Sequence, residues 1–311
     1  MAGRKHSGSD ATVMGVVITS PNRTLWPDSG DDRPVSKLDL ARYFESVADE
    51  MMPHLQGRPC SIIRTPDGIT GERFFQRHPG RGLPDAVTAV TLSGDDEPYL
   101  QIDRKAALAA LAQLSATELH PWNCRPRRPE VPGRLVFDLD PDAGLPFDCV
   151  VAAAKDVRAR LEALGLVAFC RTTGGKGLHV VTPLADETGG GPDWPAAKAF
   201  AREICARMAA DSPELYTIKI SKASRKGRMF LDYLRNDRMS TAIAPLSPRA
   251  RPGAPVAMPL TWSQVRAGLD PMRFTLRTVP RLLRKTTAWA GYDAAERPLS
   301  EAIARLAART S

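Results

Sequence analysis

A run of apolar residues leads directly into two aspartates that a single residue separates. Residues 135–137 are Leu-Val-Phe, and Asp138 and Asp140 follow them before Pro141. Because side chains alternate across a strand, a strand here directs both carboxylates to one face of its sheet. Like charges this close repel each other unless a cation lies between them, and hard divalent cations prefer oxygen ligands. The stretch therefore predicts a divalent metal site at the end of a strand. The alternative is a strand that runs out into a solvated acidic turn.

The size and composition of the chain are those of a globular protein. Its 311 residues suffice for two modest domains or one large bilobal domain, and 43% of them are hydrophobic. The sequence contains no apolar run near the ~18 residues that span a membrane. The five cysteines are scattered and form no Cys-x-x-Cys pair, which argues against a zinc ribbon and against a secreted disulfide scaffold. We therefore expect a reducing, cytoplasmic environment and no membrane partner.

Positive charge is concentrated on either side of the acidic stretches. The net charge is +8 and the isoelectric point is about 9.4. Basic clusters lie at residues 125–128, 219–228, 235–251 and 273–285. Acidic residues between basic flanks are what a metal-dependent enzyme acting on nucleic acid requires. Solvated basic loops are the alternative.

A third aspartate lies in a later segment with strand-like alternation, residues 228–234. By that alternation Asp232 shares a face with Phe230 and Leu234, and an acid on an apolar face needs a partner. A cation held jointly with the two earlier aspartates would supply one. An ion pair between Asp232 and Arg228 or Arg235 is the alternative.

A glycine-rich segment, Thr172–His179, joins two predicted strands. Its glycines let backbone amides approach an anion, Lys176 adds positive charge, and His179 begins a strand from which it could donate to a phosphate. The spacing is not that of a Walker A loop, and a strand follows it in place of a helix. The segment is therefore either a phosphate-binding loop or a glycine hairpin with a solvated lysine.

Two aromatic residues stand between two arginines. Phe74 and Phe75 are adjacent, so in a strand one enters the core and the other lies exposed, where it could stack on a base. The alternative is that both belong to the core. His120 precedes Pro-Trp, and a histidine in such a place is more often structural than functional.

Capping patterns and apolar spacing predict a mixture of helices and strands. Ser36–Asp39 has the pattern of a capping box, and apolar residues follow it at helical spacing. Asp103 and Asp148 are predicted to cap two further helices, and Thr261–Gln264 to open a final one. Strands are predicted at 61–65, 72–77, 98–102, 167–170, 178–182, 216–220 and 228–234. This mixture predicts an α+β sheet core with an N-terminal lobe.

The order of these motifs resembles a known family. Asp-Leu-Asp-Pro, then Thr-Thr-Gly-Gly-Lys-Gly-Leu-His, then Asp-Tyr-Leu-Arg-Asn is similar to the three motifs of archaeo-eukaryotic-type primases. The chain resembles more closely the polymerase domain of bacterial ATP-dependent DNA ligase D, which acts in non-homologous end joining. The likeness runs from about Val17 to about Leu283 and includes Asn22–Pro27, Leu119–Trp122 and Arg249–Gly253.

The resemblance implies roles for individual residues. As catalytic metal ligands it implies Asp138, Asp140 and Asp232. Around the incoming nucleotide it implies His120, Thr173, Lys176, His179, Arg235 and Arg249. For contact with DNA it implies Phe74 and Phe75 on the template, with Arg23 and Lys37 at a downstream 5′-phosphate. The implied cofactor is Mn²⁺ or Mg²⁺ in a two-metal site.

The resemblance also implies a fold and an activity. The fold is α+β and bilobal, with a central mixed or antiparallel sheet core flanked by helices and a smaller N-terminal lobe. The activity is addition of NTPs or dNTPs to 3′ ends and filling of short gaps at double-strand breaks, with Ku protein and a fused or separate ligase as partners. We expect a disordered lead-in at 1–12, the polymerase domain at 13–290 and a helical tail at 291–311.

Two other functions remain open from the sequence. One is a primase that starts chains without a primer, and the other is a non-catalytic module that binds DNA ends. The chain has no Lys-x-Asp-Gly ligase motif, since Thr65–Gly68 lacks the lysine. We therefore expect no sealing activity here, in a chain that is either a stand-alone polymerase or one domain of a longer ligase.

Overall fold

The computed structural model describes residues 10–309, and the chain divides into two compact units. Unit 1 comprises the chain up to Pro121 with Ile243–Ala257 and Met272–Lys285, and unit 2 comprises Trp122–Ala242, Met258–Pro271 and the chain from Thr286 onward. Residues 1–9 of the predicted disordered lead-in lie outside the described residues, whereas Ala11 and Thr12 belong to a strand. Within the described residues, no helix combines the length and the apolar character that crossing a bilayer requires.

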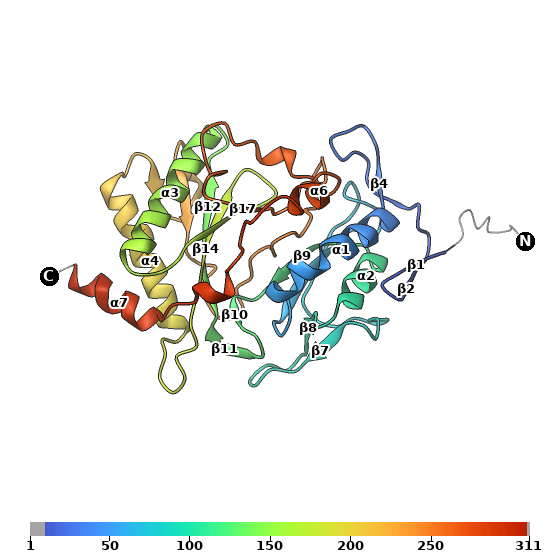
Figure 1. Cartoon of the computed structure of the whole chain (residues 1–311), viewed down its shortest axis with the longest axis horizontal. Helices are drawn as coiled ribbons and strands as arrows, with labels where there is room; N and C mark the ends of the chain where they lie inside the picture. Colours follow the sequence, from blue (N-terminus) through green and yellow to red (C-terminus); the bar gives the residue numbers. More distant parts are fainter. Residues whose placement is uncertain (1–9, 310–311) are drawn as a thin grey trace, which may run out of the picture. The chain divides into compact units, whose positions relative to one another are not determined.

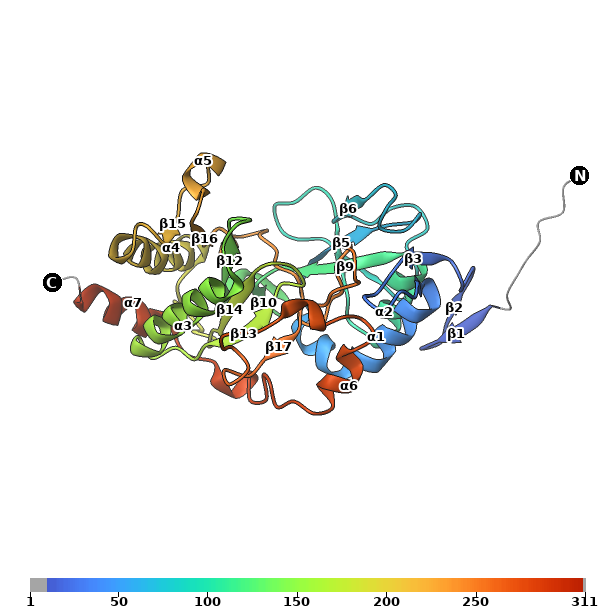
Figure 2. The ribbon, with the colours of Figure 1, turned by 90° about the horizontal axis from the view of Figure 1, so that it is seen from above.

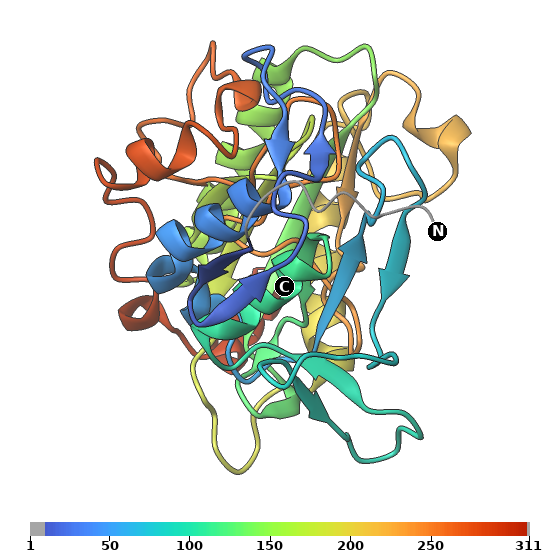
Figure 3. The ribbon, with the colours of Figure 1, turned by 90° about the vertical axis from the view of Figure 1, so that its right-hand side faces the viewer.

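Unit 1 is built from short antiparallel pairs and a helical pair. Strand β5 pairs with both β6 and β9, while β1–β2, β3–β4 and β7–β8 are hairpin-like pairs. Helix α1 packs against α2, and the β1–β2 pair (dark blue in Figure 3) lies beside α1. The elements are β1 (Ala11–Val13), β2 (Val16–Ile18), β3 (Thr24–Trp26), β4 (Val35–Ser36), α1 (Lys37–Met51), η1 (Met52–His54), β5 (Cys60–Arg64), β6 (Phe74–Gln76), β7 (Thr88–Val90), β8 (Tyr99–Gln101), α2 (Lys105–Gln113), β9 (Ala116–Pro121), η2 (Pro271–Arg273) and α6 (Val279–Leu283).

Unit 2 is organised around one mixed sheet in the order β15-β16-β12-β14-β13-β17. All neighbouring pairs in it are antiparallel except β15 with β16. Helix α3 packs against β12 and β14, and α4 packs against β15 and β12 (Figures 1 and 2). The elements are β10 (Cys124–Arg125), β11 (Arg128–Pro132), β12 (Arg134–Pro141), α3 (Phe147–Ala163), β13 (Phe169–Thr172), β14 (Leu178–Pro183), α4 (Trp194–Asp211), β15 (Tyr216–Thr217), α5 (Lys222–Arg225), β16 (Met229–Asp232), β17 (Pro259–Leu260), η3 (Asp293–Ala295) and α7 (Leu299–Ala308).

The α+β class and the mixed sheet are confirmed, and so is the first capping box. The Ser36 side chain accepts from the Asp39 amide, and the Asp39 carboxylate accepts from the Ser36 amide at 2.9 Å. The apolar face of α1 is buried, including Leu40, Phe44 and Val47. The strand predicted at 216–220 is shorter than expected, because β15 ends at Thr217. The domain boundary predicted at residue 290 stays a prediction.

Three predictions of helix starts are wrong: two residues do not cap the helices that follow them, and at the third start no helix follows. Asp103 does not cap α2, because its carboxylate accepts from Gly57 and Gln101 instead. Asp148 lies in the first turn of α3 and accepts from the Gly268 amide, 120 positions further along the chain. At residues 261–264 a capping-type bond forms from the Thr261 amide to the Gln264 side chain at 2.8 Å, but turns follow it in place of a helix. Asp103 and Asp148 thus accept from distant residues in place of capping a helix, whereas the local bond at Thr261 forms without a helix after it.

Candidate active site

A row of ionisable residues crosses the sheet of unit 2. Asp138 on β12 lies opposite His179 on β14 and, on its other side, opposite Asp232 on β16. His179 in turn lies opposite Arg171 on β13. Residues in register on neighbouring strands share a face, with Cβ atoms about 5 Å apart. Strand pairing alone therefore brings together two of the three predicted aspartates, and Asp140 follows on the same face of β12.

Cationic side chains neutralise this acidic group in the structure. Arg235 Nε lies 3.2 Å from Asp232 Oδ2 and 3.4 Å from Asp138 Oδ2. Lys176 Nζ lies 3.1 Å from Asp140 Oδ1, and Arg225 Nη1 lies 3.6 Å from its Oδ2. The alternative prediction of an ion pair between Asp232 and Arg235 is thus confirmed.

The surroundings of Asp232 disfavour its ionised form and would therefore favour a bound cation. Burial raises its pKa, although the charge of Arg235 opposes the shift, and the nearby Asp138 carboxylate raises it further. Asp232 is also fixed in direction, because its Oδ1 accepts from the Leu234 amide at 2.8 Å. Burial and a like charge together disfavour the ionised form, and a divalent cation would reverse both effects.

The residues present fit a hard divalent cation by their chemistry. Three carboxylates share one sheet face, and their oxygens are the ligands that such cations prefer. Among residues 10–309, however, no group of three or more His, Cys, Asp or Glu side chains is already placed to hold a metal ion. Metal binding therefore requires the arginine and lysine side chains to withdraw from Asp138, Asp140 and Asp232. Their assignment as metal ligands stays a prediction.

The glycine-rich loop between β13 and β14 delivers its polar residues to these carboxylates. Gly174 has φ of +65°, and a Cβ on Gly177 would lie 2.4 Å from the Leu139 carbonyl oxygen, so both positions require glycine. The loop is closed by Thr173, whose hydroxyl donates to the Gly177 carbonyl at 3.1 Å. Lys176 also donates to the Pro141 carbonyl. The loop thus brings Lys176, which is exposed, to the acidic row, and its role in phosphate binding stays a prediction.

His179 is held as a neutral donor toward the acidic row. Its Nδ1 accepts from the Arg171 guanidinium at 3.0 Å, and its Nε2 lies 3.3 Å from Asp138 Oδ1. Burial lowers the pKa of His179 to about 4, although Asp138 opposes that shift. Burial also lowers the pKa of Arg171 to about 9, which leaves the guanidinium charged at neutral pH.

A second polar cluster lies in unit 1 and contains two more of the predicted residues. The buried Glu118 carboxylate lies 2.8 Å from His120 Nε2 and 2.9 Å from Arg249 Nε, and its other oxygen accepts from the Ala250 amide. Burial would raise the pKa of Glu118, but the His120 hydrogen bond and the Arg249 charge prevail and lower it to about 2. His120 and Arg249 are therefore oriented by one ionised carboxylate.

The predicted DNA-contacting residues also lie in unit 1. Phe74 and Phe75 are both exposed, at 43% and 56%, so the expectation that one of them enters the core is wrong. Among the strands that the structure describes, β6 pairs with β5 alone, and both rings lie in solvent. Arg77 lies over the Phe75 ring at 5.4 Å. Both rings are therefore accessible to a nucleic-acid base, and base stacking stays a prediction.

Arg23 and Lys37 form a pair of neighbouring cations. The Lys37 amide donates to the Arg23 carbonyl at 2.8 Å, and Lys37 Nζ donates to the Thr19 carbonyl at 3.0 Å. Burial lowers the pKa of Lys37, and the like charge of Arg23 lowers it further. Two cations that repel each other favour an anion between them.

Four residues that shape these clusters were not singled out by the sequence reasoning. Asn236 is fully buried and bonds both backbone groups of Val136, with its Oδ1 2.7 Å from the amide and its Nδ2 2.8 Å from the carbonyl. These two bonds extend the hydrogen bonding along β12 beyond the end of β16. They therefore hold the part of β12 that precedes Asp138. The others are Arg171, Glu118 and Arg225. In the sequence, Asn236 closes the Asp-Tyr-Leu-Arg-Asn motif and Arg225 lies in a basic cluster, whereas Glu118 and Arg171 are signalled only as charged residues within strands.

Comparison with known proteins agrees with these motifs. The chain matches the model of the LigD primase-polymerase domain over residues 36–289. It is 36% identical over 302 residues to the multifunctional non-homologous end joining protein LigD of Pseudomonas aeruginosa, a match that covers 96% of this chain and 35% of that protein. It is 31% identical over 252 residues to the bifunctional non-homologous end joining protein LigD of Bacillus subtilis, covering 80% of this chain and 40% of that protein.

A solved structure supports the same relationship. The polymerase domain from Mycobacterium tuberculosis ligase D, in complex with DNA, matches with a TM-score of 0.78 and 30% identity, covering 90% of this chain and 99% of that one. The chain spans about a third of the length of the first curated relatives it matches. These matches extend well beyond the motifs, from the capping box of α1 through the last basic stretch. The chain therefore belongs to the family of LigD primase-polymerase domains.

Proposed function

We propose that this chain is a metal-dependent nucleotidyltransferase that adds NTPs or dNTPs to DNA 3′ ends and fills short gaps during non-homologous end joining. One observation carries the proposal: the register of β12 and β16 places Asp138 directly opposite Asp232, with Asp140 on the same face. The relatives are end-joining LigD proteins, and the matched solved domain is a DNA complex. Ku protein and a fused or separate ligase are proposed partners on the same ground.

The chemistry is displacement at the α-phosphate of a bound nucleotide. A primer 3′-oxygen forms a bond to that phosphorus, the bond to the β-phosphate oxygen breaks, and pyrophosphate leaves. Divalent ions held by Asp138, Asp140 and Asp232 would supply charge neutralisation and in-line orientation. The aspartates act as ligands for this purpose and not as the main general base.

The remaining residues bind and orient the triphosphate. Lys176, His179 and Arg235 already contact the acidic row through N–H groups, so each has a donor to offer a phosphate once the carboxylates turn to a metal. Thr173 shapes the loop that carries Lys176. We assign His120 and Arg249 to the nucleotide as well, because one buried carboxylate presets both side chains.

Extension of a primed DNA with a short gap tests the function. We expect single-nucleotide products with Mn²⁺ or Mg²⁺ and NTPs or dNTPs, resolved on a denaturing gel. Products formed from template and NTPs alone, without a primer, would indicate a primase. Absence of products with either metal, while the DNA is still bound, would identify a non-catalytic end-binding module.

A phosphate-dependent binding measurement tests the Arg23–Lys37 pair. Lys37→Met should weaken binding to a gap with a 5′-phosphate by roughly tenfold and leave binding to the same gap without phosphate nearly unchanged. Fluorescence anisotropy at fixed salt measures both. Lys105→Met is the matched control, because Lys105 on α2 pairs with Asp49 at the surface. Equal losses on both DNAs would show that Lys37 contributes general electrostatics only.

A further inference from the structure

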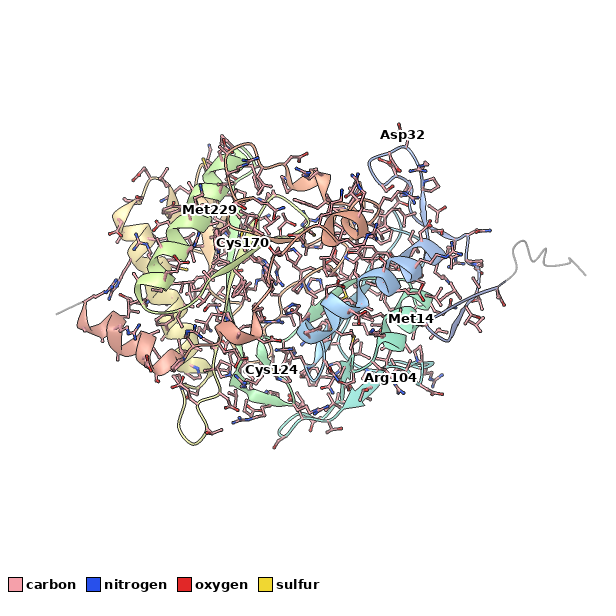
Figure 4. The ribbon with its side chains drawn as sticks, in the orientation of Figure 1. Met14, Asp32, Arg104, Cys124, Cys170 and Met229 are labelled. Atoms are coloured by element: carbon pink, nitrogen blue, oxygen red, sulfur yellow. The ribbon has the colours of Figure 1, made fainter. Side chains whose placement is uncertain are left out.

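Arg171 is a buried cation at the β13 end of the ionisable row. It is 1% exposed and lies on β13, between Cys170 (labelled in Figure 4) and Thr172. Strand register places it opposite His179, which lies opposite Asp138. Residues 171, 179, 138 and 232 therefore form one continuous line across four strands.

Burial of the Arg171 guanidinium has a high free-energy cost, because its charge is removed from water. Within residues 10–309, no carboxylate lies at ion-pair distance from its guanidinium, whose hydrogen-bond partner is the His179 ring. The next row on the same face is apolar: Phe169 and Val136 both lie opposite Val181, and Trp289 and Tyr292 pack against them. A charge buried beside such a row is costly without a specific partner. The guanidinium is held between two rings, since its Cζ lies 5.8 Å from the centre of the Trp289 ring and its Nε and Nη2 approach His179, and only the second contact directs it into the ionisable row.

The chemistry of the contact determines where the His179 hydrogen lies. Arginine is a donor only, and both its Nε and Nη2 approach His179 Nδ1, at 3.2 and 3.0 Å. Nδ1 must therefore offer its lone pair. The ring hydrogen is then on Nε2, which lies 3.3 Å from Asp138 Oδ1. A hydrogen on Nδ1 would point at the guanidinium N–H groups and repel them.

We propose that Arg171 is a positioning residue that locks His179 in its Nε2–H form and so keeps a hydrogen-bond donor directed at the acidic row. This part of the inference concerns the protein alone. Its consequence for the reaction rests on the proposed function: the same Nε2–H is the group that meets the incoming triphosphate when Asp138 turns to a metal. Arg171 thus acts through His179 and touches neither substrate nor metal.

The tautomer can be read directly in the unmodified protein. Two-bond ¹H–¹⁵N correlation spectra of protein labelled with ¹⁵N-histidine distinguish a bare ring nitrogen from a protonated one. The chain has five histidines, and His179→Gln assigns the signal by its loss. Without metal or nucleotide at neutral pH, we expect a bare Nδ1 and a protonated Nε2. A protonated Nδ1 would overturn the proposal whatever any variant does.

Matched variants then test the dependence on Arg171. Arg171→Met should mix the two His179 tautomers and raise KM for the nucleotide roughly tenfold with a smaller change in kcat, and Arg171→Lys should restore both in part. Arg134→Met is the control, since Arg134 is equally buried on β12 but donates to Asn123 and the Trp122 carbonyl. It should leave the tautomer intact.

The outcomes separate this inference from the proposed function. An unchanged Nε2–H form in folded Arg171→Met would refute the role of Arg171, and so would an unchanged KM in a variant whose tautomers mix. If the unmodified protein shows the Nε2–H form but adds no nucleotide, the proposed function fails and the positioning of His179 stands. If Arg171→Met does not fold, Arg171→Lys and the unmodified spectrum still decide.

Discussion

Asp138→Asn is expected to lower the rate of nucleotide addition by roughly a thousandfold or more, equivalent to about 4 kcal/mol of transition-state stabilisation. Asp138 occupies the centre of the row, between His179 on one strand and Asp232 on the other. Asparagine keeps the volume and the strand pairing but removes the charge that a divalent ion requires. Binding of gapped DNA should persist, because the phosphate contacts proposed in unit 1 are untouched.

Single-nucleotide extension in manganese measures the rate, and anisotropy on the same gapped DNA measures the binding. Asp237→Asn is the matched control, because Asp237 follows β16, which pairs with the strand of Asp138, but forms its ion pair with Lys198 outside the row. It should retain activity within about twofold, since a surface ion pair is worth little. Near-normal extension by Asp138→Asn would remove the acidic row from the mechanism altogether.

Glu118→Ala is expected to destabilise the protein by about 3–5 kcal/mol, because it leaves the largely buried His120 and Arg249 side chains, 15% and 17% exposed, without their shared carboxylate. Glu118 is 2% exposed, so water cannot replace the lost partner. Glu118→Gln keeps an acceptor and should cost less. Thermal unfolding followed by calorimetry measures both variants. Glu97→Gln is the control, because Glu97 pairs with His78 at 3.5 Å at the surface and should change stability by about 0.5 kcal/mol or less.

The pH dependence of this effect has a definite sign. The pKa of Glu118 falls from 4.5 to about 2 on folding, so its ionised form contributes stability above pH 4.5 and loses that contribution as the pH falls toward 2. The stability difference between the unmodified protein and Glu118→Gln should therefore be constant near neutral pH and shrink as the pH falls below about 4.5. A difference that grows in acid would contradict the ionised state of Glu118.

Local chemistry made part of the fold predictable. The α1 capping box joins Ser36 to Asp39, only three positions away, so no distant part of the chain is needed to form it. The same reasoning failed at Thr261–Gln264, where the polar bond formed but Trp262 instead reaches the Ala168 carbonyl and Val265 is buried. A capping pattern states which groups can bond, and packing decides whether a helix follows.

The candidate site likewise has one part that local sequence predicts and another part that depends on how distant strands pair. Alternation within one strand predicts that Asp138 and Asp140 share a face, because that depends only on the period of a strand. Nothing in the sequence states the register between β12 and β16, and a slip of one residue would turn Asp232 to the opposite face. Pairings between distant segments are chosen by the burial of whole faces, which is a property of the assembled sheet.

The sequence by itself thus determined which residue types are available for metal, phosphate and base contacts, and the order in which the chain presents them. Only the tertiary structure decided that Asp232 stands against Asp138, that a buried arginine faces His179, and that Glu118 holds both His120 and Arg249. The physical reason is that a buried charge is tolerated only beside its partner. Asp232 and Arg249 lie far along the chain from Asp138 and Glu118, whereas Arg171 reaches His179 across one hairpin and His120 lies two positions from Glu118 on the same strand.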